Sequence, residues 1–175
     1  MKRLLIGLII FGLSYQIQAQ NNVAYLNTSN EVKTTPTRKT NPKTLKNVLY
    51  LSKVNNKQLP IVVQKMRSKV AAFNVSDLAI YTPKEKAFYN VVFNEGDYKI
   101  IANFNHNGNL TESTETYKNV RLPVEIHAKL AKNNPEWIIS NTLCKIIYKS
   151  TSGAQITYNV ILKNDTKKKT LKVII

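Results

Sequence analysis

The sequence predicts an α+β fold made of two tandem repeats, each a helix packed on an antiparallel β-meander. Leu59-Pro60 and Leu122-Pro123 each precede a segment whose apolar residues have helical spacing. Proline suits the first turn of a helix, because its missing N–H has no partner there in any case. Each of these segments is followed by short apolar strands separated by polar turns, which is typical of a meander.

A set of short matches indicates that the unit is duplicated. Lys-Asn-Val at 46–48 recurs at 118–120, and Tyr-Asn-Val-Val-Phe at 89–93 recurs as Tyr-Asn-Val-Ile-Leu at 158–162. The two Leu-Pro pairs lie between these matches in the same order. Matches in one order favour a repeat over chance similarity. The sequence is therefore divided into four parts: a signal peptide (1–19), a leader (20–45), a first repeat (46–112) and a second repeat (113–175).

The amino terminus has the features of a bacterial signal peptide. Lys2 and Arg3 precede an apolar run at 4–13, and Ala19 meets the small-residue requirement of a cleavage site. The run is too short to span a hydrocarbon core of about 30 Å, so no transmembrane span is expected after signal removal. We therefore expect an exported protein, either periplasmic or secreted.

The segment 20–45 is predicted to be a basic, disordered leader. It is rich in Asn, Thr, Lys and Pro, and Thr-Pro-Thr-Arg-Lys-Thr-Asn-Pro at 35–42 lacks any apolar periodicity. A segment with so little apolar surface cannot offset its ordering entropy.

The first repeat is expected to contain a strand, a helix and a hairpin, in that order. The strand starts near Lys46, and the helix follows Pro60. Strands at 88–93 and 98–104 flank Asn-Glu-Gly-Asp, a hairpin connection of ordinary composition.

The second repeat is expected to follow the same plan. Its helix follows Pro123 and is stopped by Asn133, Asn134 and Pro135. Its meander is predicted from three strand patterns separated by polar turn clusters, at 137–148, 155–162 and 170–175.

The charge of the chain is strongly positive and is concentrated towards its ends. The chain has 26 Lys and Arg against 10 Asp and Glu, a net charge of +16. Ten basic residues and one acid lie in 31–69, and seven basic residues and one acid in 145–175. Such a field attracts anionic partners. The candidate contacts for an anionic partner are Lys65, Arg67, Lys69, Lys167, Lys168 and Lys169.

Two other interpretations of this charge are weighed. Nucleic acid is not expected as a partner, because the tyrosines fall mostly within strand patterns, where packing explains them, and do not interleave with the charge. The lysines could instead serve only to keep an exported chain soluble and to protect edge strands from pairing.

The segment 103–109, Asn-Phe-Asn-His-Asn-Gly-Asn, has the spacing of a calcium loop. Its alternate positions are amides and not carboxylates, and Thr114 stands where such a loop needs a bidentate Glu. Asn-Gly is also a strong turn signal. We therefore predict a turn, and no metal ligand is assigned.

No motif supports catalysis. Cys144, His127 and Glu125 could be drawn as a nucleophile with a base, but three common residue types do not make a motif. Cys144 lies in an apolar run and is interpreted as a small buried residue on a strand. The sequence therefore predicts a non-enzymatic protein, with no catalytic residue and no cofactor.

The pattern from about 45 to 175 resembles the PepSY-like, putative beta-lactamase-inhibitor-like family. The resemblance is carried by Tyr-x-Val-x-Phe, the hairpin, Ile-Ile-Ala-Asn-Phe-Asn-His-Asn-Gly-Asn-Leu, a Thr/Glu-rich stretch, Leu-Pro with its helix, and Tyr-x-Val-x-Leu. It implies an exported α+β protein of tandem repeats that binds or inhibits another envelope protein. The basic leader departs from the family pattern, as does Asn where the strand-ending turn usually carries acids.

Two functions follow from these observations. The first is a non-enzymatic binding or inhibitor-like protein that acts on another envelope or extracellular protein, with an acidic surface as one option for that partner. The alternative is a cationic envelope-associated protein that docks on an anionic surface polymer or on lipid headgroups.

Overall fold

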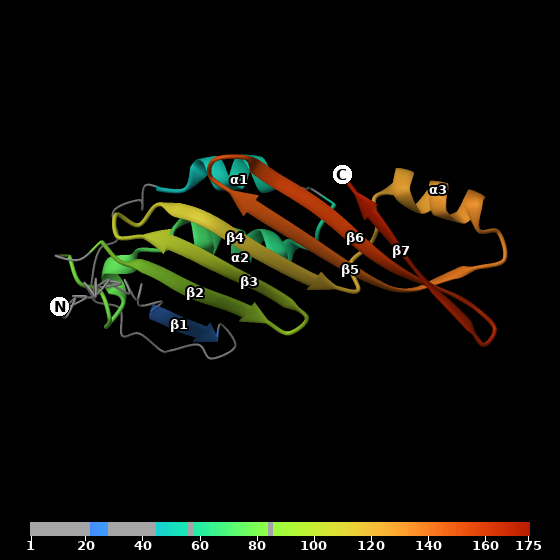
Figure 1. Cartoon of the computed structure of the whole chain (residues 1–175), viewed down its shortest axis with the longest axis horizontal. Helices are drawn as coiled ribbons and strands as arrows, with labels where there is room; N and C mark the ends of the chain where they lie inside the picture. The colour runs from blue at the N-terminus through green and yellow to red at the C-terminus, as the bar shows by residue number, and fades with distance from the viewer. Residues whose placement is uncertain (1–21, 28–44, 56–57, 84–85) are drawn as a thin grey trace, which may run out of the picture.

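The structure is a computed structural model that describes residues 22–27, 45–55, 58–83 and 86–175 (Figure 1). The predicted signal peptide lies outside these residues. One seven-stranded sheet runs through the molecule, with its strands in chain order from β1 to β7. The strands are β1 (Asn22–Asn27), β2 (Phe88–Glu95), β3 (Tyr98–Asn105), β4 (Leu110–Lys118), β5 (Ile138–Lys149), β6 (Gly153–Asn164) and β7 (Lys167–Ile174). The helices are α1 (Val48–Val54), α2 (Ile61–Ala71) and α3 (Val124–Asn133), with a short 3-10 helix η1 (Val75–Asp77).

The α+β prediction is confirmed. Strands β2 to β7 form an antiparallel meander, and each pairs with its neighbour in the chain. The helices after Pro60 and Pro123 are present as α2 and α3, and α3 ends at Asn133 as expected. Glu95 pairs with Tyr98, so the first hairpin turns through Gly96, whose φ of +57° suits a residue without Cβ.

Part of the predicted leader belongs to the sheet. Strand β1 lies within 20–45 and pairs in parallel with β2, from Asn22↔Tyr89 to Asn27↔Asn94. The disorder predicted for this part is therefore wrong, because Val-Ala-Tyr-Leu at 23–26 is a short strand-forming run inside a polar segment. The rest of the leader up to 44 lies outside the described residues.

Two further elements differ from the prediction. Residues Val48–Val54 form helix α1 where a strand was expected, and Tyr50 and Val54, four residues apart, are both buried on it. The Thr/Glu-rich stretch forms strand β4, which was not assigned. Its inward-facing residues include the polar Ser113 and Glu115. The sequence of β4 therefore lacks the alternation of apolar and polar residues that marks a strand.

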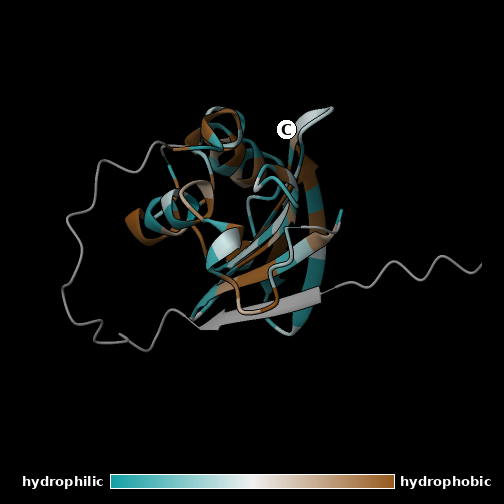
Figure 2. Cartoon of the chain, turned by 90° about the vertical axis from the view of Figure 1, so that its left-hand side faces the viewer, coloured by the Kyte–Doolittle hydropathy of each residue, from teal (hydrophilic) through white to brown (hydrophobic). Residues whose placement is uncertain are grey.

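The core lies between one face of the sheet and the pair α1 and α2. Both helices lie on the same side of the sheet, as the end-on view shows (Figure 2). Helix α1 contacts β5 and β6, and α2 contacts β3. The largest fully buried side chains are Tyr50, Tyr89, Tyr117, Tyr158, Phe104, Met66, Ile100, Ile146 and Leu162.

The two halves of the chain join edge to edge in one sheet. The predicted boundary between 112 and 113 falls inside β4, and β4 pairs with β5 from Glu112↔Lys149 to Lys118↔Leu143. Helix α1, from the first half, contacts strands of the second half. The two halves therefore share one sheet and one helical cover.

Candidate functional site

The sheet face opposite α1 and α2 carries no helix in the part of the chain that the structure describes (Figures 1 and 2). Burial alternates along each strand, as in β4, where Ser113, Glu115 and Tyr117 are buried and the residues between them are not. Because successive side chains of a strand point to opposite faces, the intervening residues lie on the uncovered side. We call this side the open face.

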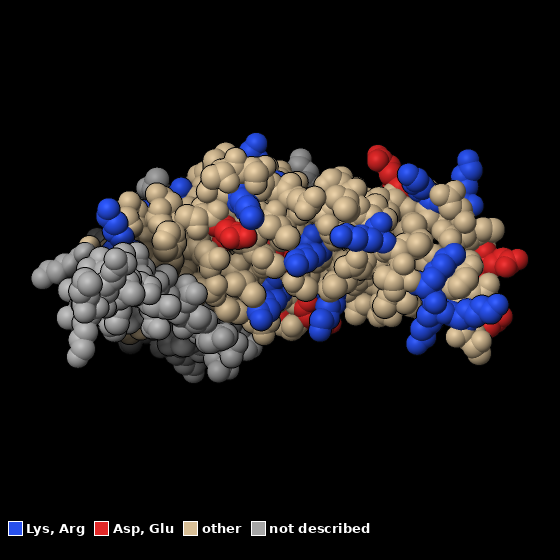
Figure 3. Space-filling model, viewed as in Figure 1, with Lys and Arg blue, Asp and Glu red and all other residues tan. Residues whose placement is uncertain are grey.

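Lysines from five strands lie on the open face and are spread along its length (Figure 3). They alternate with inward-facing residues, as Lys145 does between Cys144 and Ile146. We call this set the lysine face: Lys99, Lys118, Lys145, Lys163, Lys168 and Lys172. Among the acids in strands β2 to β7, only Glu112 lies on this side, and its register partner is Lys149. The face therefore carries a net positive charge.

The register places these lysines in rows across the sheet. One row runs Lys99↔Thr116↔Lys145, over strands β3 to β5. A second row begins at Lys118, whose partner is Leu143, and ends at Lys172. At about 4.8 Å between strands, its two lysines are separated by roughly 14 Å at the backbone. An extended anionic chain could contact more than one of them.

A hollow of about 460 Å³ lies on the open face where β4 ends. We call it the notch; its lining is Lys118, Asn119, Asn141, Thr142, Leu143, Asn159, Ile161 and Thr170. It combines amide and hydroxyl groups with one lysine and two apolar side chains. Its volume is within the range of small-molecule sites, about 300–1,000 Å³.

The predicted contacts on α2 do not lie on the open face. Lys65 and Lys69 are exposed, but their helix covers the opposite face of the sheet. Arg67 is 3 % exposed, and its Nη2 atom donates to Oε2 of Glu115 over 2.6 Å. The prediction that Arg67 contacts an external anion is therefore corrected, because its guanidinium is already paired in the core.

Arg67 belongs to a buried polar cluster that joins both helices to the sheet. Glu115, which is fully buried on β4, accepts hydrogen bonds from the hydroxyls of Tyr50 and Tyr117, each over 2.6 Å. Burial, followed by the charge of Glu115, raises the pKa of both tyrosines. Burial acts to lower the pKa of Arg67, but the charge and hydrogen bond of Glu115, together with the charges of Tyr117 and Tyr50, outweigh it and the pKa is raised. The two tyrosine hydroxyls and the Arg67 guanidinium thus hold their protons more tightly than they would in water, which fits a structural role.

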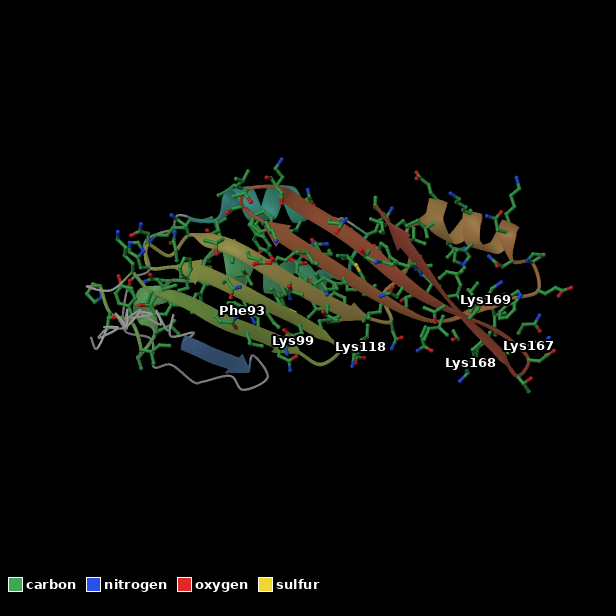
Figure 4. The ribbon with its side chains drawn as sticks, viewed as in Figure 1. Phe93, Lys99, Lys118, Lys167, Lys168 and Lys169 are labelled. Atoms are coloured by element: carbon green, nitrogen blue, oxygen red, sulfur yellow. The ribbon has the colours of Figure 1, made fainter. Side chains whose placement is uncertain are left out.

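The lysine run on β7 is divided between the two faces of the sheet. Lys168 belongs to the lysine face, whereas Lys169 lies over the ring of Trp137, 4.1 Å from its centroid. Lys167 lies at the start of the strand, where its register partner is Asn164. These residues are at the far end of the sheet from Lys99 and Lys118 (Figure 4). Adjacent charges in the sequence are therefore not one cluster in space.

Cys144, His127 and Glu125 are not brought together as a catalytic group. Cys144 is fully buried on β5, and burial raises the pKa of its thiol to about 11, although a hydrogen bond with Tyr158 opposes the shift. His127 and Glu125 are exposed on α3. His127 lines an open cleft of about 610 Å³ beside β5, and Cys144 is not part of that lining. The prediction of a small buried residue on a strand is confirmed.

The turn predicted within 103–109 is confirmed at 106–109, which connect β3 and β4, while 103–105 belong to β3. The Asn105 Oδ1 atom accepts from the backbone N–H groups of Asn107 and Asn109, both over 3.0 Å. Gly108 has a φ of +77°. Asn47, at the start of α1, accepts from the N–H of Leu110 over 2.8 Å, so the turn also anchors a helix. The amide oxygens of Asn47 and Asn105 thus serve the fold.

Most of the lysine face was missed by sequence reasoning. Lys99, Lys118 and Lys145 are single lysines in strand patterns, and no charge run marks them. The alternation within β3 and β5 would have placed two of them on the outward side. Lys118 required recognition of β4, whose pattern contains the buried Glu115.

Comparison with known proteins identifies no relative. The chain matches no protein-family model, no curated protein and no solved structure. Among the described residues, none of the helices has the length and apolar character needed to cross a bilayer.

Proposed function

We propose that this protein is a non-enzymatic binding protein of the bacterial envelope that uses its lysine face to bind an anionic surface polymer. The observation that carries this proposal is the presence of six lysines, from five strands, along a sheet face that no described helix covers. Their field attracts polyanions, and their rows match a ligand with repeated charges.

The composition of the open face favours a polymer over a protein partner. Protein interfaces have a core enriched in aromatic residues, Met and Arg and depleted in charged groups, and their strongest contacts come from Trp, Tyr and Arg. From β3 to β7 the open face has no aromatic residue and no Arg. Lysine, threonine and asparagine predominate instead, and they offer dispersed polar and electrostatic contacts.

A second candidate function is the binding or inhibition of another envelope or extracellular protein. The α3 region favours it, because Val124 is 75 % exposed and Ile126 is half-buried on the same helix. Exposed apolar surface on a helix is a feature of protein-binding surfaces. In this case α3, and not the lysine face, would contact the partner.

Three further proposals complete this assignment. Export is supported by the charge and length of the amino-terminal apolar segment. The duplicated unit is supported by a Leu-Pro helix before each of the three-stranded meanders β2–β4 and β5–β7. The resemblance to the PepSY-like family remains a proposal, and the sequence patterns are its support.

The test is binding of the mature chain to immobilised alginate, a polymer of carboxylated sugars, with neutral dextran as the reference. Replacing Lys145 and Lys172 by Gln removes two charges from the lysine face. The matched control replaces Lys65 and Lys69 by Gln, which removes two charges from the exposed side of α2. We expect the first variant to lose most binding at low salt and the control to lose little.

Two other outcomes would contradict the proposal. Equal loss in both variants would mean that net charge, and not the lysine face, drives attachment. Failure to bind alginate, combined with tight and salt-resistant capture of one envelope protein that is lost on replacing Val124 by Asp, would favour the second candidate. A variant with Lys33, Arg38, Lys39 and Lys43 replaced by Gln measures how much of the alginate binding comes from the leader.

A further inference from the structure

We propose that the notch binds one carboxylated sugar unit of the polymer, so that it recognises the unit while the lysine face attracts the chain. This inference rests on the proposed function and deepens it. Electrostatic attraction by dispersed lysines does not discriminate among polyanions, whereas a hollow with fixed amide and hydroxyl groups can.

The notch exists because β4 is shorter than β5 and β6. The pairing of β4 with β5 stops at Lys118↔Leu143, whereas β5 and β6 continue to pair as far as Ile138↔Lys163. Asn119 has a φ of +52° and turns the chain away, and Val120 is buried at 2 % exposure. The open face therefore has a step at this point, where β4 ends and β5 and β6 continue.

The step is held by hydrogen bonds on its rim. The backbone N–H of Asn119 donates to the carbonyl of Thr142 over 2.7 Å, and Asn141 Nδ2 donates to Asn119 Oδ1 over 3.2 Å. The hydroxyl of Thr142 donates to the Val120 carbonyl. Because these bonds fix the rim before any ligand arrives, less ordering entropy opposes binding.

The floor of the notch alternates polar and apolar side chains. Register rows place Leu143 beside Asn159, and place Ile161 between Asn141 and Thr170. Leu143 and Ile161 give an apolar surface for the C–H groups of a ring, while the amides and the hydroxyl can bond to ring hydroxyls. A neutral sugar could use these groups alone.

The charged residues beside the floor of the notch favour a sugar that carries a carboxylate. Lys118 lines the notch, and Lys172 is the register partner of Asn159 in the same row. None of the described residues that line the notch is Asp or Glu. A carboxylate on the sugar would be attracted from both ends of this row, so we assign a uronate-type unit to the notch. An acidic peptide would satisfy the lysines but offers no ring hydroxyls to the amides.

The experiment is a calorimetric titration of the mature chain with three soluble probes at one ionic strength: a uronate hexamer, a neutral hexasaccharide and hexaglutamate. Variants Asn159→Ala and Thr170→Ala test the neutral groups of the notch. Lys118→Gln tests its charge, and Lys69→Gln is the matched control, because it removes the same charge from the exposed side of α2, away from the open face.

We expect the uronate hexamer to bind at least tenfold more tightly than either other probe. Asn159→Ala and Lys118→Gln should each weaken uronate binding by about tenfold, and Lys69→Gln by less than twofold. Unchanged circular dichroism and unfolding midpoints would show that the variants fold. Thr170→Ala, at an exposed strand position, tests the same contacts and should weaken binding less than Asn159→Ala does.

The inference and the proposed function fail in different ways. If the uronate and glutamate probes bind equally, and Asn159→Ala and Thr170→Ala bind as wild type, the notch proposal is overturned while attraction by the lysine face stands. If no anionic probe binds, the proposed function itself fails. Preference for hexaglutamate overturns the sugar assignment in favour of an acidic protein.

Discussion

Helices α2 and α3 both follow a Leu-Pro pair, yet α2 is packed deeply against the sheet and α3 is largely exposed. Helix α2 buries Val63, Met66, Val70 and Ala71 against the sheet, with Arg67 beneath it in the Glu115 cluster. Within α3, Leu130 is the one buried residue, and it retains 9 % exposure. A shared local sequence therefore specifies the start of each helix but not how deeply it packs.

The difference arises from what surrounds each helix. Helix α1 lies beside α2 and contributes Tyr50 to the same cluster, so the two helices cover the sheet together. Among the described helices, none lies beside α3, and its residues Glu125, His127 and Lys129 are exposed. The first half of the chain thus forms the closed side of the molecule, while the α3 region leaves apolar side chains in contact with solvent.

The largest expected effect is at the cluster that distinguishes α2 from α3. Replacing Glu115 by Leu leaves the Arg67 charge buried without its partner, which should cost about 3–5 kcal/mol of unfolding free energy. Urea unfolding measures this, and Glu125→Leu on exposed α3 is the control, with an expected change below about 0.5 kcal/mol. A second variant, Arg67→Met with Glu115→Leu, should recover most of the loss; failure to recover it would contradict the assigned role of the ion pair.

Truncation of apolar side chains sharpens the same comparison. Met66→Ala on α2 removes a fully buried side chain and should lower the unfolding free energy by about 2–5 kcal/mol. Ile126→Ala on α3 removes a half-buried one and should cost less than about 1.5 kcal/mol, because the transfer term for a partly exposed side chain is smaller. Equal losses in the two variants would show that α3 packs as firmly as α2.

Alkaline pH should weaken the closed side of the molecule. The pKa of the Cys144 thiol is raised to about 11 from 9.0, and the pKa values of Tyr50 and Tyr117 are raised above 10.0. The folded state therefore keeps protons that the unfolded chain loses, so stability is full below about pH 9 and falls as the pH rises above it. Unfolding midpoints from pH 7 to 11 measure this effect. Tyr50→Phe should reduce the slope, and an unchanged slope would contradict the assignment.

Much of the architecture was predictable from local patterns. The hairpin at Gly96, the helix starts after Pro60 and Pro123, and the strands of the second meander all follow from residues close together in the chain. These features depend on turn chemistry and short-range periodicity, which the sequence displays directly.

The parts that were missed depend on contacts between distant residues. Strand β4 can bury Glu115 because Arg67 and two tyrosine hydroxyls bind its carboxylate. Arg67 lies 48 residues from Glu115 in the chain, and Tyr50 lies 65 residues from it. A buried carboxylate breaks the apolar alternation that marks a strand. The lysine face required the register of five strands, and the notch required the point at which β4 ends. A charge run in the sequence indicated none of these.

The strand order of this sheet also bears on how the chain folds. Every antiparallel pair joins strands adjacent in the chain, so β2–β4 and β5–β7 can each assemble by adding one hairpin at a time with short loops to close, whereas the connection from β4 to β5 is longer and contains α3. Helix α1 is different, because it contacts β5 and β6, far along the chain. Its docking needs the second meander to exist already. We therefore expect the sheet to grow first and α1 to close over it late, which makes the unfolding rate, more than the folding rate, sensitive to changes at Tyr50.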